Sequence, residues 1–260
     1  EKKYHDFSEQ IYIHHMEQKS DTGIQADLLQ KYTFICLDIF RDVIQNKDGE
    51  IENNLEKLLD SRVDYIYMQD KNPVFHRTKY LNVLSKLVVT PFLAVWDADV
   101  IVSCQQIISS IQLLRHGGAD IVYPYDGRFL DTTLKYRKLF IVSSDIKSLY
   151  AVQNHFVLPY GIYAIGGGFL ANRFMYSCSG GENENFYGWG PEDQERLKRW
   201  EILEYNIKRV EGPMFHLSHP RGINSCFGDY KREEDSIKEL LRICKMSKKE
   251  LCDEIKHWNW

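Results

Sequence analysis

The sequence predicts an α/β layer fold, and two observations support this prediction. From about residue 62 onward, short β-rich runs alternate with helical ones, which is typical of domains in which helices cover a sheet. The chain of 260 residues is also 43% apolar and 13% aromatic, enough to bury a sizeable core in one large domain or two tightly joined halves. We expect a single domain over residues 1–260.

The elements of this fold follow in order from the hydrophobic patterns. The run FLAVW (92–96) has the length and apolarity of a fully buried strand. Residues 105–118 have the pattern of an amphipathic helix that ends at two glycines. Ser247 and Glu250 form a capping-box pattern at the start of a last helix. The other predicted elements are strands at 63–68, 120–127, 206–210 and 214–218, and helices at 75–88 and from residue 233 onward.

The first sixty residues are harder to interpret. QIYIHHM (10–16) and YTFICLDIF (32–40) have the composition of strands, whereas IENNLEKLLDS (51–61) has the pattern of a helix. The arrangement of these three segments stays open at this level.

Charge and cysteine content exclude several classes of function. The net charge is −4, and the basic residues are interleaved with acidic ones, so we expect no nucleic-acid partner. The six cysteines form no CxxC pair, which favours reduced thiols and a cytoplasmic location. The sequence has no apolar run of about 18 residues, and its first ten residues lack the apolar segment of a signal peptide. We expect membrane association only through the acceptor or through a segment that precedes this chain.

An acidic pair, Asp97 and Asp99, directly follows the predicted buried strand. Side chains two positions apart on an extended segment point the same way, so we expect both carboxylates to face one point. Ligands of open α/β sheets bind beyond the carboxyl ends of the strands, and carboxylate oxygens suit Mg²⁺ or Mn²⁺. Alternatively, the pair is only a polar turn that ends the strand.

The segment PMFHLSHPRG holds two histidines, His216 and His219. On a strand they would face opposite ways, but a bend at Ser218 brings both to one site. Imidazole nitrogens suit Mn²⁺ better than Mg²⁺. Arg221 follows as a candidate phosphate-binding residue, because a guanidinium binds phosphate through two hydrogen bonds. The alternative interpretation is two structural histidines and a surface arginine.

Residues 180–200, GGENENFYGWGPEDQERLKRW, combine two patterns. Pro191, as first helical residue, precedes the acidic Glu192 and Asp193 and several later bases, which is a well-formed helix start. Upstream, the glycines around Trp189 leave its indole uncovered, and aromatic faces stack on sugar rings. A carboxylate beside such a platform can act as general base on a sugar hydroxyl. Alternatively, the segment is a tight turn followed by a capped helix.

Five motifs in order, FHRTKYLN, WDADV, GGGF, GENENFYGWGPEDQE and FHLSHPRG, give the chain a family resemblance. Over roughly residues 62–228 it resembles the metal-dependent, inverting GT-A glycosyltransferases that share a C-terminal module with β-1,4-galactosyltransferases, most closely the bacterial members that build surface polysaccharides. The resemblance implies a mixed, mostly parallel sheet flanked by helices. It also implies a nucleotide-binding half at 1–100, an acceptor and metal half at 101–228, and a helical tail at 229–260.

For the donor and the metal, the resemblance implies roles at matching positions. Asp99 is the more direct metal ligand, with His219 as the main histidine ligand and His216 as a second, and the ion is Mn²⁺ or Mg²⁺. Asp97 binds the donor diphosphate. The other residues placed on the donor side are Arg77, Asn82, Gly167, Gly168 and Arg221.

For the acceptor, the resemblance implies three further roles. Asp193 matches the catalytic base, and its neighbour Glu192 helps to hold the acceptor. Trp189 matches a tryptophan that contacts donor and acceptor on a mobile loop. The chain departs from the family in two places. It has no clean copy of the Pro-x-Arg pattern that holds uridine, for which CLDIFRD (36–42) is the nearest candidate, and Pro191 stands where other members have glycine.

The function implied by the resemblance is transfer of galactose or N-acetylgalactosamine from a UDP-sugar to a hydroxyl of an oligosaccharide or glycan acceptor. The expected setting is surface polysaccharide synthesis in the bacterial cytoplasm or at the periphery of the inner membrane. One alternative is a catalytically degenerate nucleotide-sugar or carbohydrate-binding module of the same fold. Another is a metal-dependent phosphohydrolase or nucleotidyltransferase, which would use the same aspartates but has no use for Trp189 beside Asp193.

Overall fold

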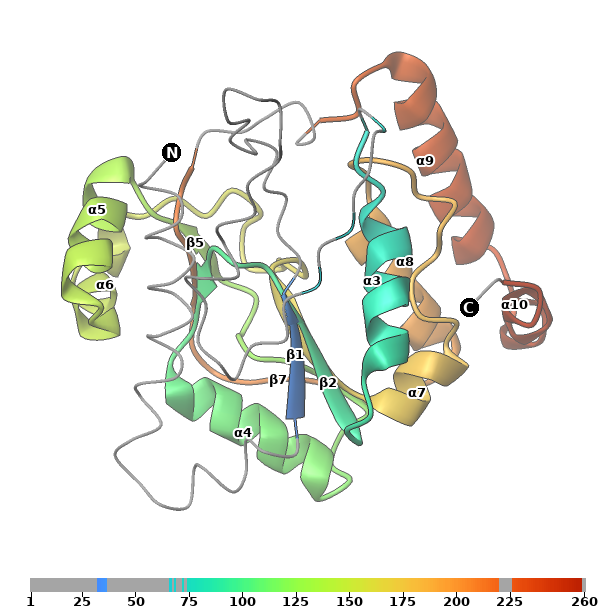
Figure 1. Cartoon of the computed structure of the whole chain (residues 1–260), viewed down its shortest axis with the longest axis horizontal. Helices are drawn as coiled ribbons and strands as arrows, with labels where there is room; N and C mark the ends of the chain where they lie inside the picture. Colours follow the sequence, from blue (N-terminus) through green and yellow to red (C-terminus); the bar gives the residue numbers. More distant parts are fainter. Residues whose placement is uncertain are drawn as a thin grey trace, which may run out of the picture.

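The computed structural model describes residues 32–36, 66, 68, 72, 74–219 and 226–258. Within these ranges, two sheets lie in the middle of the molecule and helices surround them (Figure 1). The strand and helix predicted at 10–16 and 51–61 lie outside the described residues. So does the strand predicted at 63–68, apart from two single positions.

The larger sheet has five strands in the order β1-β2-β6-β4-β7. β1 is parallel to β2 and β4 is parallel to β7, whereas β6 is antiparallel to both β2 and β4. Four strands therefore run one way and one runs against them, which confirms the mixed, mostly parallel sheet. The strands are β1 (Tyr32–Cys36), β2 (Phe92–Trp96), β6 (Gly168–Asn172), β4 (Ile121–Tyr123) and β7 (Ile207–Arg209).

The smaller sheet has three strands, β3 (Val100–Ile101), β8 (Met214–His216) and β5 (Phe129–Asp131), with β8 in the middle. β8 pairs antiparallel with β3 and parallel with β5. In this register His216 lies opposite Val100 on one side and Asp131 on the other. Three distant parts of the chain thus meet at one histidine.

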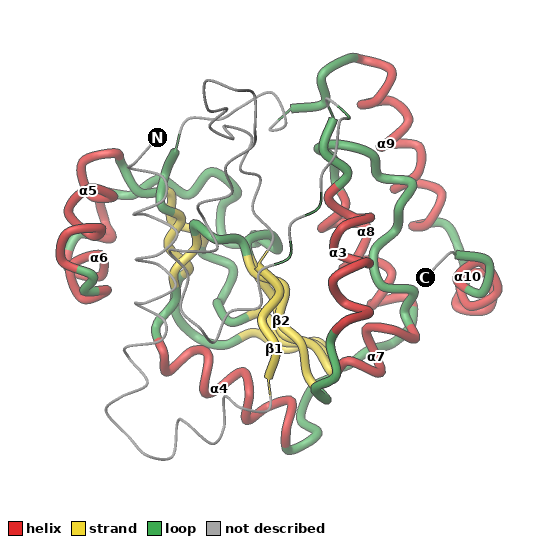
Figure 2. The backbone as a smooth tube through the Cα atoms, viewed as in Figure 1, coloured by secondary structure: helices red, strands yellow, loops and turns green. Residues whose placement is uncertain are grey.

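Helices flank both sheets, as the α/β prediction requires. In Figure 2, α3, α7 and α8 lie on one side of the larger sheet and α4 lies on the other. α5 and α6 lie beside the smaller sheet, whereas α9 and α10 lie at the opposite edge of the molecule (Figure 1). The helices are α3 (Arg77–Leu87), α4 (Cys104–Arg115), α5 (Leu134–Ser143), α6 (Ile146–Ala151), α7 (Arg173–Cys178), α8 (Glu192–Ile202), α9 (Tyr230–Cys244) and α10 (Lys248–Ile255), with a 3-10 turn η1 (Gln153–His155) after α6.

Most predicted elements within the described ranges are present. β2 matches its prediction residue for residue, and α10 begins with the predicted capping box. The strand predicted at 120–127 ends at Tyr123, and α4 ends at Arg115, before its two glycines. The sequence patterns missed the strands β3, β5 and β6 and the helices α5, α6 and α7.

The start of α8 differs by one residue from its prediction. Pro191 is the residue that precedes the helix, with φ −86° and ψ 36°, and the first helical position is Glu192. The missing N–H of proline is tolerated at either position, because the first turn leaves N–H groups without intrahelical partners. The acidic first turn and basic last turn are as predicted.

No described helix combines the length and the apolarity that a membrane crossing needs.

Candidate functional site

Asp97 follows β2 and is held from two sides. Its backbone N–H donates to the carbonyl of Gly167 over 2.9 Å, and its Oδ1 accepts from Nη2 of Arg77 over 2.7 Å. Burial raises the pKa of Asp97, and the Arg77 charge opposes that rise. Arg77 is the first residue of α3, so the start of this helix is fixed to the end of the strand.

Asp99 lies at the centre of a cluster with two histidines. Its Oδ2 is 2.8 Å from Nε2 of His219 and 3.3 Å from Nε2 of His216. Burial alone would raise the pKa of Asp99, but the hydrogen bonds from both histidines outweigh it and hold this pKa well below its usual range. The bend expected at Ser218 is not present, because residues 217–219 form neither a bend nor a turn, yet both imidazoles reach one carboxylate.

This cluster has the composition of a metal site. Asp99, His216 and His219 each offer one ligand atom, and these atoms lie within 4.8 Å of one another. Nδ1 of His216 lies 2.7 Å from Oδ1 of Asp131, the kind of outer contact that orients a ligating imidazole. One carboxylate and two imidazole nitrogens fit Mn²⁺ better than Mg²⁺, which favours oxygen ligands.

The two aspartates reach different partners. The sequence pattern predicted an extended segment with both carboxylates facing one point, but a turn at Ala98 and Asp99 follows β2. As a result Asp97 pairs with Arg77, and Asp99 pairs with the histidines. The negative charge of Asp99 still contributes to the raised pKa of Asp97, so the two groups sense each other.

Asp193 is in the first turn of α8 and is held by a buried arginine. Nη2 of Arg196 donates to Oδ1 of Asp193, and Nη1 of Arg196 donates to Oε2 of Glu182 over 2.6 Å. The Arg196 and Glu182 side chains are 2% and 1% exposed, whereas the Asp193 side chain is 28% exposed. The buried pair therefore fixes Oδ1 of Asp193, whereas Oδ2 does not bond to Arg196.

Arg77 connects the strand end to the start of α8. Its Nη1 lies 3.8 Å from Oε1 of Glu192 and 3.8 Å from Oδ1 of Asp193, while its Nη2 bonds Asp97. Burial raises the pKa of Glu192 to about 8, with the neighbouring Asp193 charge acting in the same direction. Glu192 thus holds its proton near neutral pH.

Arg77 and Glu192 each have one side-chain atom with no hydrogen-bond partner within the described part of the chain. They are Nη1 of Arg77 and Oε2 of Glu192, and both are buried. Buried polar atoms normally have a partner, because leaving one unpaired costs about 1–3 kcal/mol. A ligand hydroxyl, which both donates and accepts, suits this pair of atoms.

The glycine run 166–168, beside Asp97, leaves space that side chains of neighbouring residues occupy. A Cβ on Gly166 would lie 2.8 Å from Oδ2 of Asp193, so only a residue without a side chain leaves this carboxylate in place. Gly167 has a φ of +85°, and its Cβ would meet Met214 at 2.7 Å. A Cβ on Gly168 would lie 3.1 Å from the ring of Trp96. The glycine that adjoins Asp193 is Gly166, which sequence reasoning did not single out.

Asn82 is buried and bound to the segment that precedes Trp189. Its Nδ2 donates to the carbonyl of Glu182 and to Oε1 of Glu184, each over 2.9 Å, and its Oδ1 accepts from the Glu182 N–H over 2.8 Å. These contacts tie α3 to this segment. A direct contact of Asn82 with a donor stays a prediction.

Trp189 is partly uncovered, as its glycine neighbours suggested. The residue is 41% exposed, and its ring packs edge-on against Phe227 with centroids 4.8 Å apart. Arg221 lies outside the described residues, and so does Arg41, the arginine of the CLDIFRD segment that is the nearest candidate for holding uridine.

Sequence reasoning missed three residues that complete the site, namely Gly166, Arg196 and Asp131. Arg196 was grouped with the ordinary bases of a helix, and only its i+3 spacing from Asp193 hints at the pair. Asp131 is on a strand that the sequence patterns did not predict, and pairing with β8 is what brings it to His216.

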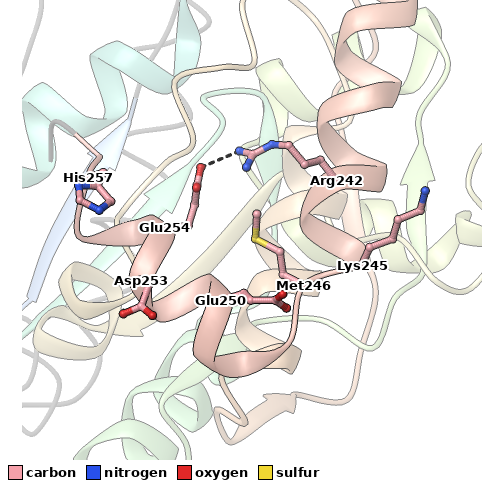
Figure 3. A pocket seen from close by; sticks show the side chains of 7 residues that line it. All are labelled: Arg242, Lys245, Met246, Glu250, Asp253, Glu254 and His257. Carbon is pink, nitrogen blue, oxygen red and sulfur yellow. Dashed lines mark hydrogen bonds and ion pairs between the residues drawn. The ribbon is translucent and has the colours of Figure 1, made fainter.

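A separate hollow of about 440 Å³ lies between α9 and α10 and contains none of these residues (Figure 3). Several of its charged groups are bound within the tail. Arg242 donates to Glu254 over 2.8 Å, and Glu250 closes the capping box of α10. The candidate site is therefore the region around Asp97, Asp99 and Asp193.

Comparisons with known proteins give one partial family match. A family model described as the N-terminal domain of galactosyltransferase matches residues 147–220, less than a third of the chain. The matched segment includes Asp193, Trp189 and both clustered histidines. No curated protein matches the chain.

Two solved structures are weakly similar. The catalytic domain of Drosophila β1,4-galactosyltransferase 7, in complex with xylobiose, is 17% identical with a TM-score of 0.32 over 52% of this chain and 45% of its own. Glucosyl-3-phosphoglycerate synthase from Mycobacterium tuberculosis, in complex with Mn²⁺, uridine diphosphate and phosphoglyceric acid, is 16% identical with a TM-score of 0.37 over 63% of this chain and 52% of its own. The match thus spans about half the length of each of these proteins.

Proposed function

We propose that this protein is a metal-dependent, inverting glycosyltransferase with a GT-A fold. It would transfer galactose or N-acetylgalactosamine from a UDP-sugar to a saccharide hydroxyl, in bacterial surface polysaccharide synthesis. The observation that carries the proposal is the position of Arg77, 2.7 Å from Asp97 and 3.8 Å from Asp193. Arg77 joins Asp97, at the end of β2, to the candidate base Asp193 at the start of α8.

A metal would be held by Asp99, His216 and His219. Bound there, Mn²⁺ would neutralise the charge that develops on a leaving diphosphate. Asp131 orients His216 through its Nδ1, which leaves Nε2 directed toward Asp99.

Asp193 serves as the general base in this proposal. Arg196 holds its Oδ1, so Oδ2, beside Gly166, is the oxygen that accepts the proton of the acceptor hydroxyl. The hydroxyl then attacks the anomeric carbon from the face opposite the diphosphate, and the configuration inverts. Because Arg196 is itself fixed by buried Glu182, the base is held in one orientation before the acceptor arrives.

Glu192 and Trp189 position the acceptor. Glu192, with a pKa of about 8, is protonated at neutral pH and can donate a hydrogen bond to a sugar oxygen without adding a second charge beside Asp193. The uncovered face of Trp189 offers a surface for a sugar ring. Closure of the Trp189 segment over the donor, which would exclude water, stays a prediction. The division of the chain near residues 100 and 228 also stays a prediction.

A screen of UDP-sugars tests the proposal. Each sugar is titrated into the full chain by calorimetry with Mn²⁺ present, and slow release of uridine diphosphate is then followed. We expect binding that requires Mn²⁺ and a preference for the galactose-configured donors. No binding of any UDP-sugar contradicts the proposal, and binding without turnover across a panel of saccharide acceptors identifies the degenerate module instead. Rapid hydrolysis without an acceptor identifies a phosphohydrolase.

A further inference from the structure

The region of α5, α6 and the loop 157–163 exposes an unusual amount of apolar surface. Of the seventeen large hydrophobic side chains exposed in the described residues, eight fall in this region. On α5, the exposed Leu134 and Val142 are eight positions apart, two helical turns, so they lie on one face. We call the eight side chains the apolar edge: Leu134, Leu139, Val142, Val157, Leu158, Tyr160, Ile162 and Tyr163.

The apolar edge is contiguous at the start of α5. Asp131, three residues before Leu134, exchanges backbone hydrogen bonds with Val157, with N···O distances of 2.9 and 3.4 Å. The ring of Tyr136 also packs on those of His155 and Phe156, just before the loop. The loop and the helix therefore emerge side by side.

The same region is basic in an acidic protein. Residues 132–164 contain four Lys or Arg residues and one Asp, and no Glu, whereas the whole chain has a net charge of −4. Lys135 and Lys138 are exposed on the face of α5 that carries Leu134 and Val142, and Lys147 is exposed on α6. None of these three lysines forms an ion pair within the described ranges.

We propose that the apolar edge and its lysines bind the surface of a membrane that contains anionic lipids. Exposed apolar side chains interleaved with lysine are the composition of interfacial segments, which bury the apolar groups at the headgroup boundary and attract anionic lipid through the basic groups. A two-fold dimer through this face would place like charges against each other, because both copies would contribute the same patch. A membrane provides the opposite charge.

The proposed surface adjoins the candidate metal cluster. The backbone of Val157 is hydrogen-bonded to the backbone of Asp131, and the Asp131 side chain is hydrogen-bonded to His216. Tyr160 packs edge-on against Phe129, and Phe129 stacks on His216, with ring centroids 5.6 and 5.2 Å apart. A membrane-bound chain would therefore hold its candidate site next to the lipid surface. This differs from the expectation that membrane association comes only through the acceptor or a preceding segment.

The test is sedimentation of the full chain with two kinds of vesicle, pure phosphatidylcholine and phosphatidylcholine mixed with phosphatidylglycerol. We expect binding to the anionic vesicles only, weakened by salt. The Lys135→Gln/Lys138→Gln variant should bind roughly 30-fold more weakly, the loss expected for two lysine contacts. Leu139→Ser/Val142→Ser should also weaken binding. Matched controls are Lys231→Gln/Lys249→Gln and Val89→Ser, which change exposed residues on other elements.

Three results would overturn the proposal. The first is that the chain does not sediment with anionic vesicles. The second is that the control variants lose as much binding as the test variants. The third is that the wild type is a dimer and that substitutions in the apolar edge convert it to a monomer. Circular dichroism melts of all variants show whether each one is folded. The binding of a UDP-sugar with Mn²⁺ is measured on the same samples, so a failure of the membrane proposal is distinguished from a failure of the proposed transferase function.

Discussion

Arg196 donates to Asp193 from one terminal nitrogen and to Glu182 from the other, and the second contact spans 2.6 Å between side chains that are almost fully buried. A partly exposed carboxylate is thereby anchored to the protein interior. An arginine can do this because its planar guanidinium presents several donors in a fixed geometry. Oδ2 of Asp193, which does not bond to Arg196, is thus held in place indirectly by these two buried side chains.

The first prediction concerns this anchor. Arg196→Met should lower the free energy of unfolding by about 3–5 kcal/mol, because Glu182 is left as an uncompensated buried charge. The double variant Arg196→Met/Glu182→Leu should recover part of that stability, since both charges are gone. Urea unfolding of the wild type, both single variants and the double variant measures the coupling. Additive losses would show that the two side chains do not interact.

The second prediction concerns pH. The pKa of Glu192 is raised to about 8, so the folded chain binds this proton more tightly than the unfolded chain, in which the carboxyl titrates near 4.5. The stabilisation from this group is present below the unfolded pKa and is lost as the pH rises toward 8. The unfolding free energy of Glu192→Gln minus that of the wild type should therefore be larger at pH 8 than at pH 5, because only the wild type loses stability between these pH values. Unfolding free energies at the two pH values test this, with Glu201→Gln, an exposed change on α8, as control. An equal difference at both values contradicts the raised pKa.

The third prediction concerns Gly166. In Gly166→Ala the new methyl group would lie 2.8 Å from Oδ2 of Asp193 and must push this carboxylate aside. We expect kcat for sugar transfer to fall by roughly 100-fold, because a shift of about 1 Å at the base costs that much, while the melting temperature changes little. Gly118→Ala, three residues after the end of α4, is the control. Normal kcat in a folded Gly166→Ala protein would show that Oδ2 does not need this space.

The fourth prediction concerns the metal cluster. His219→Ala and Asp99→Asn should each remove most Mn²⁺ binding, because each supplies one of three clustered ligand atoms. Asp131→Asn should weaken binding by a smaller factor, roughly 10-fold, since Asp131 only orients His216. Calorimetric titration with Mn²⁺ measures the three affinities, and His155→Ala, on an exposed turn, is the control. If Asp131→Asn costs as much as Asp99→Asn, Asp131 is itself a ligand.

The parts of the fold that sequence patterns predicted are those with strong local signals. β2 is a continuous apolar run, and the capping box of α10 is a fixed four-residue pattern. β6 was missed because it begins within the glycine run, and glycine is depleted in strands. It becomes a strand because β2 and β4 pair with it on both sides, a tertiary effect that no local window contains.

In the candidate site, too, local features were predictable from the sequence and features that depend on tertiary structure were not. The association of Asp99 with His216 and His219 was predictable from the chemistry of the side chains, although the bend expected at Ser218 is not present. The separation of Asp97 from Asp99 was not, because it depends on a turn after β2. The role of Arg196 also depends on burial, which helical spacing alone does not reveal.

The most direct test of the central proposal compares Asp193→Asn with the wild type in two assays. One measures sugar transfer from the donor found by the UDP-sugar screen, and the other measures binding of uridine diphosphate and Mn²⁺ by calorimetry. We expect transfer to be abolished and both binding affinities to stay within about twofold, because Asn keeps the shape of the side chain but cannot accept the proton. Transfer at the wild-type rate, or loss of uridine diphosphate binding, would contradict the assignment of Asp193 as the base.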